Sequence, residues 1–332
     1  MIEIGVKPLV HNIWHNFPQI ESALQETKKL MKEGLSIQIP EIEEKIIEYI
    51  DAPGKYLRAG LVLMFYYLEK GTIKREAIKL AASIELFHLA SLIHDDVIDL
   101  APTRRGIETM DSVHGNKIAI YAGDYLLAFS SRLMAEINYE QNLSKQNAWM
   151  MESVMRGELR QLVNNFNNKM TMMDYLRQIR GKTAMLFALS TLSGYYLAEN
   201  QAVRYRVAKL VGLNLGMAFQ LQDDLIDYRQ SQSVSGKPRC QDIQNGIYTA
   251  PLILAKEKNP EIASILSTTK SWTDDDLERL DELIVEANGY RDTQLLVDSY
   301  INKALKYLNV LSQNEYKYSI EQLIKVISNR NF

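Results

Sequence analysis

Apolar side chains recur at intervals of three and four residues along most of this 332-residue chain. No stretch sustains the polar and apolar alternation that is typical of a half-buried strand. Prolines stand between the apolar stretches or at their starts, where a helix tolerates them, as Pro40, Pro102 and Pro251 do. The sequence therefore predicts an all-α protein.

The expected helices cover most of the chain, and they are residues 20–34, 41–51, 55–70, 74–99, 116–137, 146–167, 172–198, 201–229, 247–257, 274–288, 291–311 and 315–329. Serine, glycine and proline gather in residues 230–246, which predicts a loop. A chain of this length often forms two domains, but one large helical domain is also allowed. Because no linker interrupts the pattern, we expect one domain over residues 1–332, with a motif-rich core at about 50–255 and further helices at 274–329.

Composition narrows the class of protein. A hydrophobic content of 46% supports a large core, and a net charge of -3 argues against a nucleic-acid partner. Cys240 is the only cysteine, so no intramolecular disulfide can form. The N-terminus lacks the apolar core of a signal peptide, and no run of about 18 apolar residues predicts a membrane span. We therefore expect a soluble cytoplasmic protein.

Two acidic pentads end long apolar stretches. The first pentad is Asp95–Asp99 (DDVID) and the second is Asp223–Asp227 (DDLID). Residues four apart are neighbours on a helix, so the first and last acids of each pentad share one face. Crowded carboxylates repel one another and are costly to desolvate unless a cation lies between them. Oxygen ligands in this arrangement suit magnesium better than zinc, so the pentads predict magnesium sites.

Basic side chains accompany both pentads. Carboxylate-bound magnesium needs an anion to complete its coordination, and diphosphate oxygens bridge such ions well. Lys55 and Arg58 lie three apart at an expected helix start, where free backbone amides also favour anions. Further cations follow the first pentad, interrupt the apolar helix 172–198 and lie in the loop after the second pentad: Arg104, Arg105, Lys182 and Lys237.

These motifs together resemble the trans-isoprenyl diphosphate synthase (polyprenyl synthetase) family, and in particular the catalytic subunits of long-chain heptaprenyl and other polyprenyl diphosphate synthases. The resemblance follows the family's motif order over about residues 50–255, through Gly54-Lys55 to Arg58, Glu85 to His88, the first pentad, Arg104-Arg105-Gly106, Gly123 to Leu127, Gly181-Lys182-Thr183, Phe219-Gln220 with the second pentad, and Gly236-Lys237-Pro238. It implies a single-domain helical bundle of the isoprenoid synthase type with a central cavity. The implied activity is a magnesium-dependent condensation of isopentenyl diphosphate with an allylic diphosphate such as farnesyl diphosphate.

The resemblance also implies ligands for about three Mg²⁺ ions, which would neutralise the departing diphosphate. Asp95 and Asp99 would bind two of these ions and Asp223 the third. Three further acids would support them: Asp96, Asp224 and Asp227.

Substrate contacts follow from the same resemblance. The allylic diphosphate would lie on Arg104, Lys182 and Lys237, and isopentenyl diphosphate would lie on Lys55, Arg58, His88 and Arg105. Thr183 and Gln220 would face the carbocation and stabilise it with oxygen dipoles, which act strongly in a dry cavity. The released diphosphate would take the final proton.

The chain departs from the family pattern at four positions. Tyr56 and Ala59 replace an arginine and a proline of the usual Gly-Lys-Arg-x-Arg-Pro, Gln222 stands where a basic residue is common, and Cys240 replaces a glycine. These departures predict altered affinity or loop mobility, while every expected metal ligand is kept.

Product length is predicted from the first pentad, where Val97 and Ile98 are the two residues between the acids. Bacterial short-chain synthases of the family have four residues there, which favours a longer product here. Ala90 and Ser91, one turn before the pentad, are too small to block a tunnel for the growing chain. Phe87 and Phe129 are the larger candidates for its floor. We expect roughly six to nine isoprene units, as in quinone side chains.

Several alternatives stay open at this point. The chain could be a farnesyl or geranylgeranyl synthase, or a non-catalytic subunit that shapes the tunnel of a heteromeric synthase. A terpene cyclase shares the metal chemistry but lacks a second diphosphate site, so the cations expected for isopentenyl diphosphate argue against it. We expect a homodimer, with residues 116–137 at the interface, or a heterodimer with a small subunit, and at most peripheral membrane contact for product release.

Overall fold

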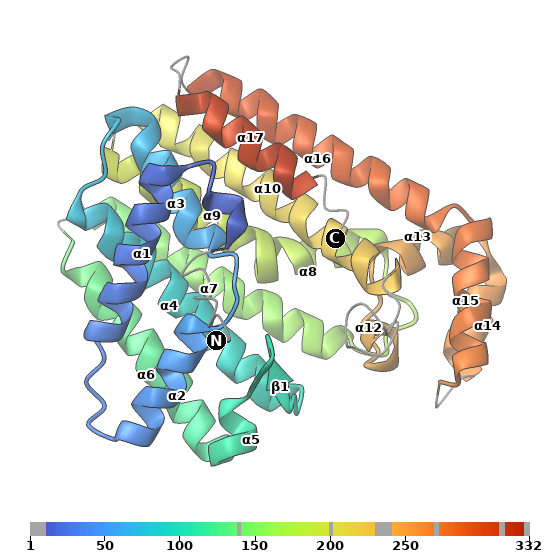
Figure 1. Cartoon of the computed structure of the whole chain (residues 1–332). Coiled ribbons are helices and arrows are strands. Elements are labelled where there is room, and N and C mark those ends of the chain that lie inside the picture. Colours follow the sequence, from blue (N-terminus) through green and yellow to red (C-terminus); the bar gives the residue numbers. More distant parts are fainter. Residues whose placement is uncertain are drawn as a thin grey trace, which may run out of the picture. The chain divides into compact units, whose positions relative to one another are not determined.

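The computed structural model describes residues 11–137, 141–198, 202–229, 241–268, 272–311 and 316–328. In these ranges the chain is almost entirely helical, and its strands are the two-residue β1 (Thr103–Arg104) and β2 (Ile107–Glu108) (Figure 1). The prediction of an all-α protein is confirmed. By its internal contacts the chain divides into two compact units. The first unit comprises Met1–Ser144, Ser190–Arg206 and Ser312–Ile320, and the second comprises Lys145–Leu189, Val207–Leu311 and Glu321–Phe332.

The N-terminal elements precede the β1–β2 hairpin or follow it directly, and they are η1 (Asn12–Trp14), α1 (Pro18–Glu33), α2 (Pro40–Asp51), α3 (Leu57–Lys70), α4 (Arg75–Ile98), α5 (Met110–His114) and α6 (Asn116–Ala135). The later elements are α7 (Gln141–Asn164), α8 (Met172–Ile179), η2 (Arg180–Ala184), α9 (Met185–Ala198), α10 (Ala202–Arg229), α12 (Gln241–Gln244), α13 (Ala250–Lys258), α14 (Pro260–Thr268), α15 (Asp274–Glu286), α16 (Gly289–Leu311) and α17 (Tyr316–Ser328).

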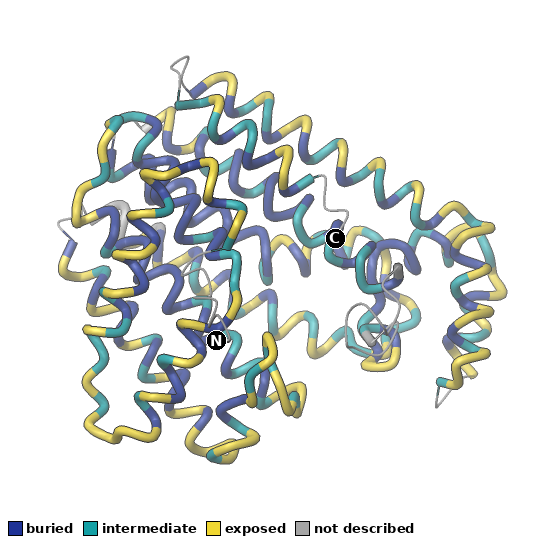
Figure 2. Tube along the Cα trace, in the orientation of Figure 1, coloured by how far each residue is buried: buried dark blue, intermediate teal, exposed yellow. Residues whose placement is uncertain are grey.

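Helix α4 lies in the core of the first unit, packed against α1, α3 and most extensively α6. Two reciprocal hydrogen bonds between serines link α4 and α6. The Ser83 hydroxyl donates to the Ser130 carbonyl at 2.8 Å, and the Ser130 hydroxyl donates to the Ser83 carbonyl at 2.7 Å. Figure 2 shows α3 and α4 as largely buried. Among the described helices, only α4 is long and apolar enough to cross a membrane. Its most apolar window is 72% buried, as in the core helix of a soluble protein.

The structure refines the expected helices in two places. The segment 172–198 is not one regular helix, because α8 widens into the π-helical turn η2 before α9. Helix α14 is not among the expected helices. It begins at Pro260, in the first turn, where a helix tolerates proline.

Short elements escaped the periodicity analysis for a different reason. The β1–β2 hairpin, α5 and α12 are too short to show a repeat. Helix α12 lies within the segment 230–246 that was expected to be a loop. Lys237 and Cys240 lie outside the described residues.

Candidate active site

The first pentad forms the C-terminal end of α4. Asp99 caps the helix, and its amide donates to the Asp95 carbonyl at 2.8 Å, so the backbone stays helical across the pentad. Asp95 is half-buried and Asp99 is exposed. The two side chains therefore lie one turn apart on the same face, as the spacing predicted.

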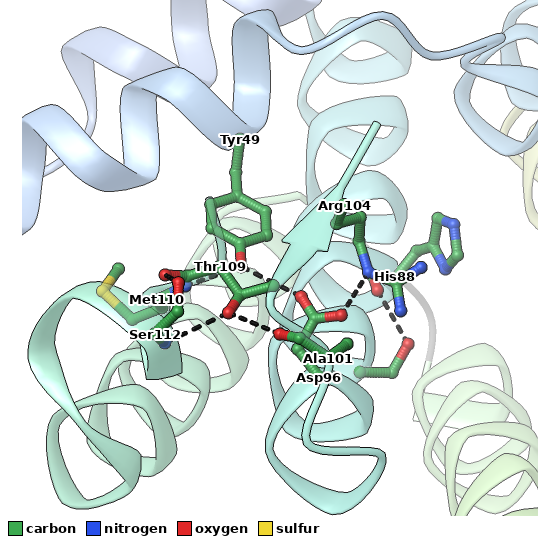
Figure 3. Close-up of polar contacts among 9 residues, drawn as sticks. Tyr49, His88, Asp96, Ala101, Arg104, Thr109, Met110 and Ser112 are labelled. Carbon is green, nitrogen blue, oxygen red and sulfur yellow. Dashed lines mark hydrogen bonds and ion pairs between the residues drawn. The ribbon is translucent and has the colours of Figure 1, made fainter. Parts of the chain in front are cut away.

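Asp96 points into the protein instead, where its side chain is fully buried. Its Oδ2 accepts a hydrogen bond from the Tyr49 hydroxyl at 2.9 Å, and its Oδ1 accepts one from Nε of Arg104 at 2.5 Å (Figure 3). The Tyr49 oxygen in turn accepts the Met110 amide at 2.9 Å. Burial raises the pKa of Asp96, while Arg104 and Tyr49 oppose that shift. Asp96 therefore ties α2, α4 and the hairpin together, and its support of a metal ion stays a prediction.

The hairpin presents two adjacent arginines. Its turn residues Arg105 and Gly106 both have positive φ, 52° and 81°, which is the signature of the tight turns that join two short antiparallel strands. Arg104 faces Asp96, and Arg105 passes over Gly54, where an added Cβ would lie 2.5 Å from the guanidinium. Glycine at position 54 therefore leaves the room that Arg105 occupies.

Basic side chains gather where α3 begins. The Arg58 guanidinium lies 2.9 Å from Nε2 of His88, which is on α4. Burial lowers the pKa of His88 well below its usual value, and Arg58, Arg105 and Arg104 lower it further. A neutral ring must accept at Nε2 from Arg58, so Nδ1 carries the proton and can donate to an anion. The structure thus brings Arg58, His88 and Arg105 together, as predicted.

A buried acid balances this cluster. Glu85 lies beneath Arg58 and Arg105, and its Oε2 accepts the Ala59 amide at 3.2 Å. Burial raises the pKa of Glu85, and the two arginines counteract the shift. Ala59 supplies this amide because it replaces the proline of the family pattern, which has no N–H.

The second departure in this segment is Tyr56, which lies directly before α3. Its ring is buried and its hydroxyl donates to the Ile50 carbonyl at 2.6 Å, with the Lys28 ammonium 5.3 Å from the ring centre. The adjacent Lys55 is half-buried, and its carbonyl accepts the indole N–H of Trp14 at 2.6 Å. The start of α3 is thus held by the side chains of Trp14 in η1 and Tyr56 at the N-cap.

The second pentad lies near the end of α10, in the second unit. Asp223 and Asp227 are half-buried and one turn apart, whereas Asp224 is only 2% exposed. Asp224 accepts hydrogen bonds from the Tyr175 hydroxyl and from Nε2 of Gln220, the latter at 3.0 Å. Burial raises the pKa of Asp224 to about 7, against these two bonds and the backbone amide of Ala250, which lower it. The second acid of the pentad is again bound to neighbouring side chains, and its support of a metal ion stays a prediction.

Lys182 and Thr183 lie on the π-helical turn η2, and such turns are frequent at functional sites. The Lys182 ammonium pairs with Glu158 of α7 at 2.7 Å, and the Thr183 hydroxyl donates to Oε1 of Gln220 at 2.7 Å. The sequence interpretation missed Glu158. The acid directly after Gly157 in α7 was the available signal.

The donor set can be tested against magnesium. Within the described ranges, no three Asp, Glu, His or Cys side chains gather into a closed ligand cluster. The acids instead form pairs one turn apart, Asp95 with Asp99 and Asp223 with Asp227. Magnesium is commonly held by one or two carboxylates together with phosphate and water oxygens. These pairs therefore fit a metal that shares its coordination with a diphosphate.

The residues expected to limit product length are only partly together. Phe87 and Ala90 are buried in α4, and the Ser91 hydroxyl donates to the His88 carbonyl at 2.7 Å. Phe129, the other large candidate, lies on α6. Its ring packs at the C-terminal end of α1, where a Cβ on Gly34 would lie 2.3 Å away, and Arg132 stacks 4.7 Å from the ring centre. Phe129 is therefore committed to the α1–α6 contact.

An all-α fold in which two helices present acid pairs, with basic side chains beside each, defines the class of the isoprenoid synthases. Residues 40–286 match the Polyprenyl synthetase family. The chain is 32% identical over 297 residues to heptaprenyl diphosphate synthase component 2 of Bacillus subtilis (strain 168), covering 88% of this chain and 84% of that protein.

Solved structures agree with this match. The geranylgeranyl pyrophosphate synthase of Lactobacillus brevis superposes with a TM-score of 0.90 at 30% identity, covering 96% of this chain and 99% of that one. A polyprenyl synthase of Caulobacter crescentus CB15, complexed with calcium and isoprenyl diphosphate, gives a TM-score of 0.86 at 30% identity, covering 94% and 96%. The chain belongs to the polyprenyl synthetase family, whose members are prenyltransferases.

Proposed function

We propose that the chain is a magnesium-dependent prenyltransferase that condenses isopentenyl diphosphate with an allylic diphosphate. Its product would be a long all-trans polyprenyl diphosphate of roughly six to nine isoprene units. The observation that best supports this function is the cluster of Arg58, His88 and Arg105 over buried Glu85. His88 and Glu85 of this cluster belong to α4, the helix that ends in the acid pair Asp95 and Asp99.

Isopentenyl diphosphate would bind to Lys55, Arg58, His88 and Arg105. Arg58 is oriented by the neutral His88 ring, so its charge stays available to an anion. Arg104 and Lys182, which are each oriented by one acid, would bind the allylic diphosphate through charge-assisted hydrogen bonds. Lys237 is proposed for the same diphosphate on its motif alone.

Asp95, Asp99, Asp223 and Asp227 would hold magnesium, and the bound ions would neutralise the leaving diphosphate. Thr183 would present its oxygen to the positive charge that develops on the allylic carbon. Burial of Thr183 keeps this position dry, which strengthens the interaction.

Three observations support a long product. The first pentad has two residues between its acids, Ala90 before it is small, and the B. subtilis relative is named a heptaprenyl synthase component. We also propose a cytoplasmic enzyme that supplies a quinone side chain. The shorter farnesyl or geranylgeranyl product is the alternative, since the L. brevis structure is that of a geranylgeranyl synthase.

The deciding experiment incubates the purified protein with magnesium, farnesyl diphosphate and labelled isopentenyl diphosphate and sizes the products by chromatography. We expect labelled chains of roughly six to nine units. A product of four units would reject only the proposed length, whereas incorporation by neither the protein alone nor its mixture with a small subunit would reject the activity.

A heteromeric enzyme is the second candidate, because the B. subtilis relative is named component 2. In that case the chain would be the catalytic subunit, since both acid pairs and the cations beside them are present. Adding a candidate small subunit should then raise incorporation, and size-exclusion chromatography would distinguish a homodimer from a mixed dimer.

A further inference from the structure

Four polar side chains of the second unit form one continuous chain of hydrogen bonds. The Tyr175 hydroxyl donates to Oδ2 of Asp224, and Nε2 of Gln220 donates to Oδ1 of the same carboxylate at 3.0 Å. Oε1 of Gln220 then accepts the Thr183 hydroxyl at 2.7 Å. The chain thus runs from α8 through α10 to the π-helical turn η2.

The direction of this chain is fixed by its chemistry. Oδ1 of Asp224 accepts from Nε2 of Gln220, and only the NH₂ group of a glutamine amide can donate, so Gln220 turns that group toward Asp224. Its carbonyl oxygen is then the atom left for Thr183, and the Thr183 hydroxyl must donate its proton there. The lone pairs of the Thr183 oxygen are consequently the acceptor at the open end of the chain.

This geometry bears on the roles expected of Gln220 and Thr183. Gln220 was expected to offer its own oxygen to the carbocation, and one lone pair of that oxygen accepts the Thr183 hydroxyl. We propose that Tyr175 and Asp224 are positioning residues that lock the Gln220 amide in one orientation, so that Thr183 presents oxygen lone pairs, and not its O–H, to the developing positive charge. The inference rests on the proposed function, because it names how that reaction's charge is met.

Burial makes the arrangement effective. Tyr175 is 1% exposed, Asp224 2% and Thr183 6%. Hydrogen bonds in such dry surroundings polarise one another, and a dipole aimed at a charge is stronger there than in water. A Thr183 hydroxyl turned the other way would point its hydrogen at a cation and oppose the reaction.

The test begins with Tyr175→Phe, which removes only the hydroxyl that fixes Asp224. The matched control is Tyr290→Phe, because Tyr290 also donates to an aspartate of the second unit, Asp281, and phenylalanine keeps the packing of its ring on Tyr228. We expect Tyr175→Phe to lower kcat roughly tenfold to a hundredfold with KM values within about twofold, which is the signature of a lost transition-state interaction. Tyr290→Phe should leave both constants unchanged.

A double-mutant cycle with Thr183→Val separates positioning from general support. If Tyr175 acts through Thr183, Tyr175→Phe should have little further effect on kcat once the Thr183 hydroxyl is gone. An equal loss of kcat in both backgrounds would overturn the inference, as would full kcat in the Tyr175→Phe single variant.

Asp224→Asn provides a second route should Tyr175→Phe fold poorly. The new amide can donate to Gln220 and reverse the direction of the chain, so kcat should fall at least as far as in Tyr175→Phe. Wild-type kcat in Asp224→Asn would reject the directional argument.

Wild-type turnover in the same assay keeps the two proposals apart, because an inactive wild type rejects the proposed function itself. A spectroscopic readout does not need turnover at all. The side-chain ¹⁵N–¹H signals of Gln220, assigned by their loss in Gln220→Glu, should show slow hydrogen exchange in the wild type and faster exchange in Tyr175→Phe. Unchanged exchange would overturn the positioning role.

Discussion

The acids of each pentad divide into two kinds at the scale of single residues. Asp95 and Asp223 are partly accessible, whereas Asp96 and Asp224 are buried and each accepts a hydrogen bond from a tyrosine hydroxyl. The same five-residue pattern therefore supplies both a ligand face and an internal anchor, because neighbouring helical positions point about 100° apart.

Substitutions at Asp95 and Asp96 should separate these two roles. We expect Asp95→Asn to abolish turnover while leaving thermal unfolding almost unchanged. Asp96→Asn should lower the free energy of unfolding by about 1–3 kcal/mol, because it weakens buried bonds to Arg104 and Tyr49. Product formation and thermal melts measure the two effects, and equal melting temperatures for both variants would contradict the assignment.

His88 predicts a pH dependence of stability. Its pKa in the folded protein lies well below the usual 6.5, so the unfolded chain binds a proton that the folded chain does not as the pH falls below that value. The wild type should therefore lose stability there by up to about 1.4 kcal/mol per pH unit from this group. His88→Gln, which can still accept from Arg58, should lose less. If the melting temperatures of the wild type and of His88→Gln fall equally between pH 7.5 and 5, a neutral His88 in the folded protein is contradicted.

The sequence predicted the parts of the site that depend on local spacing. Acids four apart share a face in any helix, so both pairs were predictable. The partners Tyr49 and Tyr175 were not, because they lie 47 and 49 residues from Asp96 and Asp224 and meet them only through tertiary packing. The same holds for Phe129. Periodicity predicts that its side chain is buried, but not that its ring packs beside Gly34.

At the scale of elements, the π-helical turn η2 depends on a glycine contact. A Cβ on Gly157 of α7 would lie 2.1 Å from the Lys182 amide nitrogen, and one on Gly181 would lie 2.9 Å from the Gly157 Cα. The two backbones thus touch directly, which lets Glu158 reach Lys182. The apolar periodicity of residues 172–198 predicts a helix, but it carries no sign of the widened turn. That turn arises where the backbones of Gly157 and Gly181 meet.

Gly157→Ala should force the two backbones apart. We expect it to destabilise the protein by about 1–3 kcal/mol and to raise KM for the allylic substrate, because Lys182 shifts with the turn. Gly54→Ala is the comparison, since its Cβ would meet the end of the Arg105 side chain, which can move. The expectation fails if calorimetry shows Gly157→Ala to be as stable as wild type.

The hairpin turn holds Arg105 in a backbone conformation that favours glycine or asparagine. Arg105→Asn relieves that strain but loses the attraction to Glu85, so its free energy of unfolding should stay within about 1 kcal/mol of wild type. KM for isopentenyl diphosphate should rise, while Arg105→Lys should retain more affinity. A wild-type KM for isopentenyl diphosphate in Arg105→Asn would contradict the proposed role of Arg105 in binding this substrate.

For the whole molecule, ligand binding should appear as stability. Because the acid pairs lack a third protein ligand in the described residues, magnesium and diphosphate should bind together rather than singly. We expect inorganic diphosphate plus magnesium to raise Tm more than the sum of the separate shifts, by the linkage of binding to folding. Asp95→Asn should lose this excess, and additive shifts in the wild type would contradict shared coordination.

The family and the helical class were predictable for the whole chain because motif order and periodicity are both written along it. The two compact units were not predicted, since each combines segments distant in sequence. Segments 190–206 and 312–320, for example, join the first 144 residues.

The contact of Trp14 with the start of α3 has a practical consequence for handling the protein. Residues before α1 look like a dispensable leader that an expression plasmid could omit. Yet the Trp14 indole N–H donates to the Lys55 carbonyl. Its ring also packs against Gly60, where an added Cβ would lie only 2.0 Å from Cη2 of Trp14. A protein shortened to begin at α1 should keep its helical circular-dichroism spectrum but bind isopentenyl diphosphate poorly. Its weak activity would then result from the missing Trp14 and not from the active site itself.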